Sequence, residues 1–219
     1  MPGWPPPWSA CSSATSGTEN DVAARGRGLT ITAGIHRGRR LRVPPGIRPT
    51  TDRIRAAAFD ALQGPPPARV LDLYAGSGAF GLEALSRGAA YACFIERSRR
   101  AAAVIRQNLD LLDFREQGEV VLGDARRLAL ARGAPFGLVF ADPPYADDPW
   151  VALFDALETP GVLTNDALVV TETSSRIGAP RAPFGWHRVK ERRHGDTTFA
   201  IFVRVAPQRM QLRREPPSL

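Results

Sequence analysis

Between residues 69 and 158 the chain alternates short apolar runs with amphipathic segments. The apolar runs suit strands buried in a parallel sheet, and the segments between them repeat their apolar positions with a helical period. Such alternation is typical of strands joined by crossover helices. The expected strands are 69–74, 90–96, 119–124 and 136–141, and the expected helices are 79–88, 98–113, 125–133 and 149–158.

Three later segments also have strand-like composition: 167–175, 186–193 and 197–205. The last two are separated by the sequence His-Gly-Asp, which favours a tight antiparallel turn. The pattern therefore predicts a doubly wound α/β domain whose sheet finishes with an antiparallel pair.

A basic segment and a short helix precede this sheet. Residues 29–34 and 39–43 read as two short strands joined by the loop IHRG, which predicts a hairpin. Thr50 or Thr51 can cap a helix that runs to about Gln63. Its apolar positions are Ile54, Ala58 and Leu62, with Arg53 and Arg55 pointing elsewhere.

The length of 219 residues and the 43% hydrophobic content suit one domain with one core. Residues 1–27 are rich in Pro, Ser and Gly without an apolar period, and we expect them to be disordered. We expect a flexible tail at 207–219. The domain between them, 28–206, divides into a basic hairpin (28–47), a helix and linker (48–66) and the catalytic sheet (67–206).

The charge balance points towards a nucleic acid. Basic residues number 29 against 22 acidic ones, for a net charge of +7, and Lys190 is the single lysine. The planar guanidinium of arginine suits phosphate, although an arginine-rich genome would give the same excess. Two cysteines without a CxxC pair argue against a disulfide framework or a structural zinc. We therefore expect no metal. We also expect no membrane span, because no window reaches roughly 18 continuous apolar residues. The expected location is the cytoplasm.

A glycine-rich loop follows the first strand of the expected sheet. Gly76, Gly78 and Gly81 have the spacing GxGxxG between a strand and a helix, which lets the backbone approach a ligand closely. Glu96 ends the next strand, within reach of ribose hydroxyls. The spacing predicts a ligand that carries adenosine, and it does not choose between a dinucleotide and S-adenosylmethionine.

Two further carboxylates favour S-adenosylmethionine. Asp72 lies below the loop, where it would repel a pyrophosphate and attract a cationic amino acid or sulfonium group. Asp124 follows the third strand and can accept from an adenine amine. Either acid could instead cap the helix that follows it. The candidate cofactor-binding residues are Asp72, Ala75, Gly76, Ser77, Gly78, Glu96, Arg97, Asp124 and Ala125.

Asp142 opens the motif DPPY at the end of the strand 136–141, where two prolines cannot continue a ladder of hydrogen bonds. An exocyclic base amine becomes a better nucleophile when acceptors hold its hydrogens, and the carboxylate of Asp142 and the carbonyl of Pro143 can be those acceptors. Tyr145 offers a ring on which an extruded base can stack. The candidate catalytic residues are Asp142, Pro143, Pro144 and Tyr145. The alternative is a plain strand-ending turn.

DPPY resembles the signature of methyltransferases that modify exocyclic amines of bases. From about Thr30 to Val205 the chain is similar to the bacterial RsmD family, which methylates the N2 amine of a guanine in 16S ribosomal RNA. The motifs that carry this resemblance are ITAGIHRGRRL, RPTTDRIR, LDLYAGSGAFGLEALSRGA, IER, GDA, DPPY and HGDTTF. Ala33 stands where the family has glycine, and residues 1–27 have no counterpart in it.

The resemblance implies a class I (Rossmann-like) methyltransferase fold, with a mostly parallel seven-stranded sheet, an antiparallel last strand and an N-terminal β-hairpin. It also implies S-adenosylmethionine as the cofactor and 16S ribosomal RNA or the small ribosomal subunit as the partner of a monomeric enzyme. RPTTDR would lie near the cofactor and the target base. The candidate RNA-binding residues are Arg37, Arg39, Arg40, Arg48, Thr51 and Arg53. A second basic cluster, Arg188 to His194, reads as an exposed strand face and is left out of the site.

Three other functions stay open at this point. DPPY also occurs in DNA adenine-N6 methyltransferases, although the chain has no added target-recognition domain. An NAD-dependent oxidoreductase would explain the glycine loop and Glu96 and leave DPPY without a role. A non-catalytic RNA-binding protein would explain the charge alone.

Overall fold

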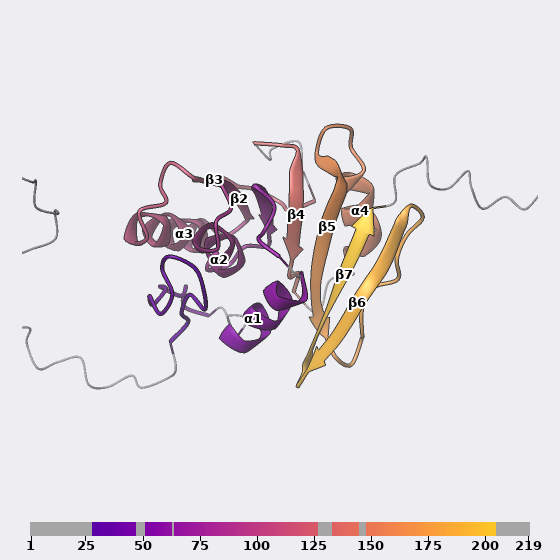
Figure 1. Cartoon of the computed structure of the whole chain (residues 1–219), viewed down its shortest axis with the longest axis horizontal. Helices are drawn as coiled ribbons and strands as arrows, with labels where there is room; N and C mark the ends of the chain where they lie inside the picture. The colour runs from indigo at the N-terminus through magenta and orange to yellow at the C-terminus, as the bar shows by residue number, and fades with distance from the viewer. Residues whose placement is uncertain (1–27, 47–50, 63, 127–132, 145–147, 205–219) are drawn as a thin grey trace, which may run out of the picture.

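The computed structural model describes residues 28–46, 51–62, 64–126, 133–144 and 148–204. Within these ranges a sheet of seven strands has the order β3-β2-β1-β4-β5-β7-β6 (Figure 1). The strands are β1 (Arg69–Leu73), β2 (Tyr91–Glu96), β3 (Gly118–Leu122), β4 (Phe136–Ala141), β5 (Leu163–Ser174), β6 (Trp186–His194) and β7 (Thr197–Arg204). The helices are α1 (Asp52–Ala61), α2 (Ala79–Ser86), α3 (Arg99–Leu111) and α4 (Trp150–Leu157).

The sheet is mixed, as the sequence predicts. β1 pairs in parallel with both β2 and β4, and β3 and β5 extend the parallel region on either side. β7 is antiparallel to both β5 and β6, between which it lies. The strand order reverses between β1 and β4, and in such sheets this switch point opens a crevice beyond the carboxyl ends of the strands.

Helices cover both faces of the sheet (Figure 1). One core joins α1, α2 and α3 to one face, with the rings of Phe94 and Phe140 at its centre, and residues 28–46 add Leu29, Ile31 and Leu41 to it. The other core lies between the sheet and α4. The expected helix 125–133 falls largely outside the described residues.

Gly81 allows α2 to lie close to the sheet. A Cβ atom at this position would lie 2.3 Å from the ring of Phe94, well inside van der Waals contact. Gly78, the N-cap of α2, has a φ of 78°, a left-handed conformation that favours glycine. The glycine spacing therefore has a packing role as well as any role in binding.

The segment 28–46 pairs with itself more sparingly than a hairpin of two strands would. Its antiparallel pairing is one isolated bridge between Thr30 and Arg40, with backbone hydrogen bonds on either side. The amides of Thr30 and Thr32 point away from this pairing and donate to the carboxylates of Asp52 and Glu83, which hold the outer edge of the segment. We call residues 28–46 the N-terminal segment.

The expected helix after this segment is α1, and Thr51 is its N-cap, with a side-chain oxygen that accepts from the amide of Ile54 at 3.4 Å. One expectation for α1 is wrong. The side chain of Arg55 does not point away from the apolar face, because it is 0% exposed and lies in the interior between α1 and α2.

Candidate active site

A pocket of about 770 Å³ opens at the carboxyl edge of the parallel strands. Most of the predicted cofactor-binding and catalytic residues meet there. Those that line it are Asp72, Ala75, Gly76, Ser77, Glu96, Arg97, Asp124, Ala125, Asp142 and Pro144. Gly78 and Pro143 lie next to the lining rather than in it, and Tyr145 lies outside the described residues.

The loop between β1 and α2 forms one wall of this pocket. Tyr74 and Gly76 both have positive φ, of 58° and 57°, so the chain turns sharply before α2 begins. Glu96 holds the loop in place, since its carboxylate accepts from the amide of Gly76 at 2.9 Å and from the amide of Ser98 at 2.7 Å. Each carboxylate oxygen retains acceptor capacity, so Glu96 can fix the loop and still face a ligand.

Asp72 lies beneath the loop with 3% of its surface exposed. Its carboxylate accepts from the amide of Gly81 at 2.9 Å, so it caps α2 from within the sheet. Burial raises its pKa to about 8, and the charges of Asp142 and Glu96 add to the rise, against the opposing effect of the Gly81 amide. The carboxyl groups of Asp72, Glu96 and Asp142 therefore interact at one end of the pocket, and burial favours the protonated form of Asp72.

Asp124 lies at another part of the wall and has a partner that the sequence reading did not include. Its carboxylate forms an ion pair with the guanidinium of Arg126, with an N–O distance of 2.6 Å, and also accepts from the Arg126 amide at 2.9 Å. Both residues line the pocket. Arg126 therefore sets the orientation of the Asp124 carboxylate.

The motif DPPY begins directly after β4. Ala141 pairs with Leu73 of β1 on one side and with Thr171 of β5 on the other, so Asp142 follows the innermost strands of the sheet. Pro143 is buried, and Pro144 is exposed at the pocket. This position beside the end of β1 explains why the charges of Asp142 and Asp72 interact.

Phe80 is a lining residue that the sequence reading missed. Its ring stacks on that of Phe140, with centroids 4.4 Å apart and planes inclined by 22°, and so gives the pocket an apolar wall. The signal available in the sequence is its place directly before the third glycine of the loop. Tyr74, Pro45 and Gly46 are further lining residues without a prior indication.

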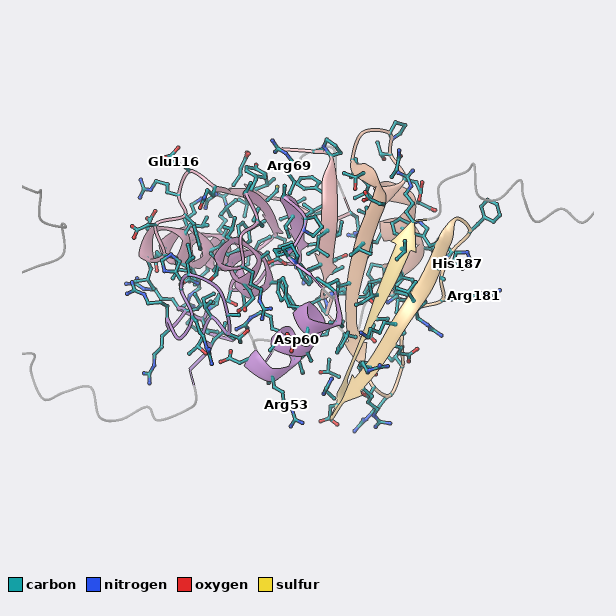
Figure 2. The ribbon with its side chains drawn as sticks, in the orientation of Figure 1. Arg53, Asp60, Arg69, Glu116, Arg181 and His187 are labelled. Carbon is teal, nitrogen blue, oxygen red and sulfur yellow. The ribbon has the colours of Figure 1, made fainter. Side chains whose placement is uncertain are left out.

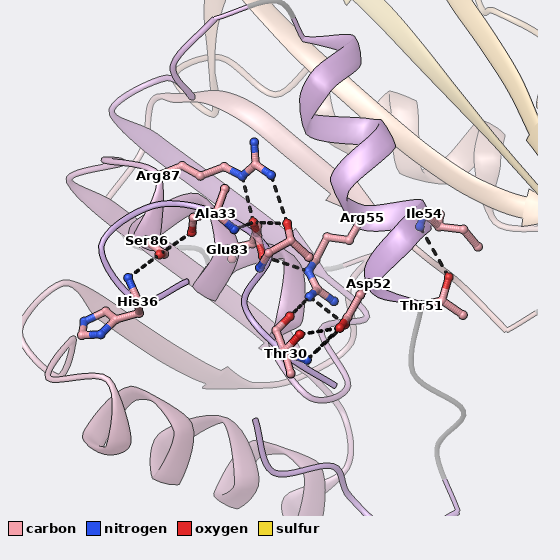
Figure 3. Close-up of polar contacts among 12 residues, drawn as sticks. Thr30, Ala33, His36, Thr51, Asp52, Ile54, Arg55, Glu83, Ser86 and Arg87 are labelled. Atoms are coloured by element: carbon pink, nitrogen blue, oxygen red, sulfur yellow. Dashed lines mark hydrogen bonds and ion pairs between the residues drawn. The ribbon is translucent and has the colours of Figure 1, made fainter. Parts of the chain in front are cut away.

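A buried ion pair attaches α1 to α2 on this side of the molecule (Figure 3). The Nε atom of Arg55 lies 3.2 Å from a carboxylate oxygen of Glu83, and both side chains are 0% exposed. The same guanidinium pairs with Asp52 at 3.1 Å and donates to the carbonyl oxygen of Thr30. Arg55 therefore cannot contact an RNA phosphate, although it is one of the basic residues that give the chain its positive net charge.

Glu83 also holds the N-terminal segment. Its carboxylate accepts from the backbone amides of Thr32 at 2.8 Å and Ala33 at 3.0 Å, and from the guanidinium of Arg87 at 2.8 Å. Burial alone would raise the pKa of Glu83, but the hydrogen bonds from Thr32 and Arg87 and the charge of Arg55 outweigh it and leave the pKa below its usual value. Glu83 is therefore a charged anchor inside the protein.

Asn108 of α3 forms a second anchor, also missed by the sequence reading. It is 0% exposed, accepts from the amide of Arg42 at 2.8 Å, and donates to the carbonyl oxygens of Arg42 and Ser77 at 2.9 and 3.1 Å. Arg42 belongs to the N-terminal segment and Ser77 to the glycine loop. One amide group thus links the segment to the wall of the pocket.

Four of the predicted RNA-binding arginines lie in the described part of the chain, and none of these four lines the pocket. Arg37, Arg39 and Arg40 are exposed on the N-terminal segment, and Arg53 is exposed on α1 (Figure 2). Thr51 has a defined structural role as the cap of α1. Arg48 lies outside the described residues.

Two further features concern the part of the chain that the structure describes, namely its possible metal ligands and the length of its apolar helices. No group of three or more His, Cys, Asp or Glu side chains there is arranged to hold a metal ion. Among those same residues, no helix has the length and apolar character needed to cross a membrane.

Comparison with known proteins gives consistent matches. The family model described as conserved hypothetical protein 95 matches residues 29–203. Ribosomal RNA small subunit methyltransferase D of Escherichia coli (strain K12) is 38% identical over 181 residues, which cover 81% of this chain and 91% of that protein. The protein of the same name from Haemophilus influenzae is 33% identical over 182 residues, covering 80% and 93%.

Solved structures agree with the fold. That of yhhF from Escherichia coli has 37% identity and a TM-score of 0.71, and the match covers 81% of this chain and 98% of that one. TrmN from Thermus thermophilus shares the fold alone, with 19% identity, a TM-score of 0.57 and a match over 69% and 48% of the two chains. The sheet is that of a class I, Rossmann-like methyltransferase with an antiparallel last strand.

The buried ion pair makes the first testable prediction. Substituting Arg55→Met leaves Glu83 buried without its full set of charged partners, and we expect a loss of about 3 kcal/mol in the free energy of unfolding, measured by urea denaturation. Arg53→Met removes the same charge two positions earlier on the exposed side of α1 and should change stability by no more than about 0.5 kcal/mol. Equal effects of the two substitutions would contradict the assigned role.

The pKa of Asp72 makes the second prediction. A folded-state pKa of about 8, above the value of 3.8 for an unperturbed aspartate, means that only the unfolded state releases this proton as the pH rises from about 4 to 8. Wild-type stability should therefore fall relative to Asp72→Asn by about 1 kcal/mol per pH unit between pH 5 and 7. Urea denaturation of both proteins at each pH measures this, and parallel stability curves would exclude the raised pKa.

Proposed function

Because the chain belongs to the RsmD family, we propose that it transfers a methyl group from S-adenosylmethionine to the N2 amine of a guanine in 16S ribosomal RNA. The substrate would be an assembled or assembling small subunit, and the enzyme would act as a monomer in the cytoplasm. The observation that carries the proposal is that Asp142 of DPPY borders the same pocket as the glycine loop and Glu96. A methyl donor and a base amine could therefore meet at one edge of the sheet.

The residues of the pocket suit S-adenosylmethionine. When bound, this cofactor would supply a methyl group on a positively charged sulfur. The carboxyl groups of Asp72, Glu96 and Asp142 favour a ligand that carries positive charge, because such a ligand would stabilise the charged form of each group, including that of Asp72. A dinucleotide would bring the negative charges of a pyrophosphate to the same place. The acidity of the pocket therefore supports the methyl donor over NAD.

Asp142 and Pro143 would act on the base. The carboxylate and the carbonyl oxygen can each accept a hydrogen of the exocyclic amine, which orients the amine and makes its lone pair more available. Two consecutive prolines restrict the backbone around these acceptors and place no amide hydrogen between them. The contribution of the chain is chiefly orientation, so the proposal needs no metal. Stacking of the base on Tyr145 remains part of the proposal.

The N-terminal segment would hold the RNA. The segment reaches the pocket at its last residues, Pro45 and Gly46, which line it. Its exposed arginines lie farther back along the segment, where Arg39 donates to the carbonyl oxygen of Leu111 at the end of α3. Contacts of this kind position a nucleic acid through its phosphates without reading its sequence. Entry of a base into the pocket also requires that it leave its stack, which a loop of ribosomal RNA permits at modest cost.

The test is transfer of a labelled methyl group. Purified protein is incubated with S-adenosylmethionine labelled in its methyl group and with small ribosomal subunits from cells that lack the enzyme, and the labelled nucleoside is identified by mass spectrometry. The proposal predicts N2-methylguanosine in the small-subunit RNA. Label in DNA adenine would retain the mechanism and reject the substrate, and the absence of transfer to any nucleic acid would reject the function.

The same assay tests the role of Asp142. Asp142→Ala should lower kcat by at least about 100-fold and leave binding of the subunit nearly unchanged, because the lost interaction acts on the reacting amine. Asp148→Ala is the matched control, since Asp148 also lines the pocket and loses the same charge. Its kcat should stay within about threefold of wild type. Similar losses in both variants would mean that Asp142 acts only through the charge of the pocket.

A further inference from the structure

β6 carries a row of basic side chains that the proposed reaction does not use, from Arg188 to His194. Its paired neighbour in the described sheet is β7, and β6 forms the edge. Paired residues on antiparallel strands point to the same side of a sheet, so the partners on β7 decide which face each basic side chain occupies. Two different faces result.

Lys190 and Arg192 point to the face that α1 covers. They pair with Ile201 and Phe199, which both belong to the core beneath α1. Lys190 confirms this directly, because its ammonium group donates to the carbonyl oxygen of Ala61 in α1 at 3.2 Å.

His194 lies on the same face as Lys190 and Arg192, since its ring stacks on Phe199 with centroids 5.7 Å apart and planes inclined by 6°.

Arg193 points to the opposite face. Its partner on β7 is Thr198. Ala200 lies two positions further along β7 on the same face, and it belongs with Phe202 to the core on the side of α4. Arg192 and Arg193 are therefore adjacent exposed arginines that face opposite sides of one strand. They offer a matched pair for an experiment.

The basic end of β6 also lies level with the pocket. Ala141, the residue before DPPY, pairs with Thr171; Thr171 pairs with Ala200; and Ala200 pairs with Glu191. Residues 192–194 thus continue beyond the same edge of the sheet as Asp142. Three steps between neighbouring strands, at about 4.8 Å each, separate the two by about 14 Å.

α1 lies between this end of β6 and the N-terminal segment (Figure 1). Arg53 projects from α1 into solvent on the same side of the molecule (Figure 2). The N-terminal segment, α1 with Arg53, and the basic end of β6 therefore follow one another in this order (Figure 1). Positive groups arranged in this way match the regular charge of a nucleic acid backbone.

We propose that Lys190, Arg192 and His194 form a second phosphate-binding surface for the RNA, on the opposite side of α1 from the N-terminal segment. This inference rests on the proposed function and extends it. The RNA backbone runs from the N-terminal segment over α1 to β6, so the nucleotide that enters the pocket is held on both sides. Contacts on both sides position the substrate strand without contributing to the chemistry at Asp142.

The test compares Arg192→Glu with Arg193→Glu in the full-length protein. Small subunits from cells that lack the enzyme serve as the RNA probe, and initial rates of methyl transfer give kcat and KM at several salt concentrations. Arg192→Glu should raise KM for the subunit by at least about fivefold, with kcat and the KM for S-adenosylmethionine unchanged, and should reduce the salt dependence of binding by about one phosphate contact. Arg193→Glu makes the same change in net charge and should stay within about twofold of wild type.

Equal KM values for the two variants, whether both are raised or both unchanged, would overturn this inference and leave the proposed function intact. A fall in kcat for Arg192→Glu at saturating subunit would also overturn it, because a phosphate contact remote from the reacting amine affects binding. If the wild-type protein neither binds nor methylates the subunit, the proposed function fails, and this inference fails with it.

Discussion

The arrangement of the site depends on the buried ion pair between Arg55 and Glu83. Taking two charges out of water is costly. The pair is stabilised because Glu83 also accepts from the amide of Thr32 and Arg55 also donates to the carbonyl oxygen of Thr30. A well-packed apolar pair of the same volume could give equal stability, but it would not specify which backbone groups are held. Here the pair fixes the N-terminal segment and α1 against α2, on the face where an RNA would lie.

Helix α2 and the side chain of Asn108 connect that face to the pocket. α2 begins at the glycine loop and carries Glu83, while Asp72 caps α2 from the sheet below. Asn108 adds a connection from the N-terminal segment to the carbonyl of Ser77. The surface that would bind RNA and the loop that would bind the methyl donor are therefore parts of one hydrogen-bonded unit. Such a unit can hold a base and a methyl group in a fixed relation, which is the main requirement of an in-line transfer.

The sequence predicted the sheet and its helices well because most strands are compact apolar runs and most junctions have Gly, Pro or Asp. It predicted most of the pocket for a related reason, since parallel strands deliver the residues after their carboxyl ends to one edge. It predicted a two-stranded hairpin where the structure has one isolated bridge, and a local pattern could not show that Asp52 and Glu83 hold the outer edge of this segment. Arg55 was misplaced because a charged residue in a helix reads as exposed until its partner on another element is known. Phe80 and Asn108 were missed because each acts through neighbours distant in the sequence.

The central claim is that a crowded acidic pocket is built to receive a positively charged methyl donor. The most direct measurement is the number of protons released when S-adenosylmethionine binds at pH 7, obtained by isothermal titration calorimetry in buffers of different ionisation enthalpy. With a pKa of about 8, Asp72 is mostly protonated at this pH, and a cationic ligand beside it should expel that proton. We expect wild-type protein to release about one proton more than Asp72→Asn. Equal proton release from the two proteins would contradict this claim, because it would mean that the charge of the donor does not act on Asp72.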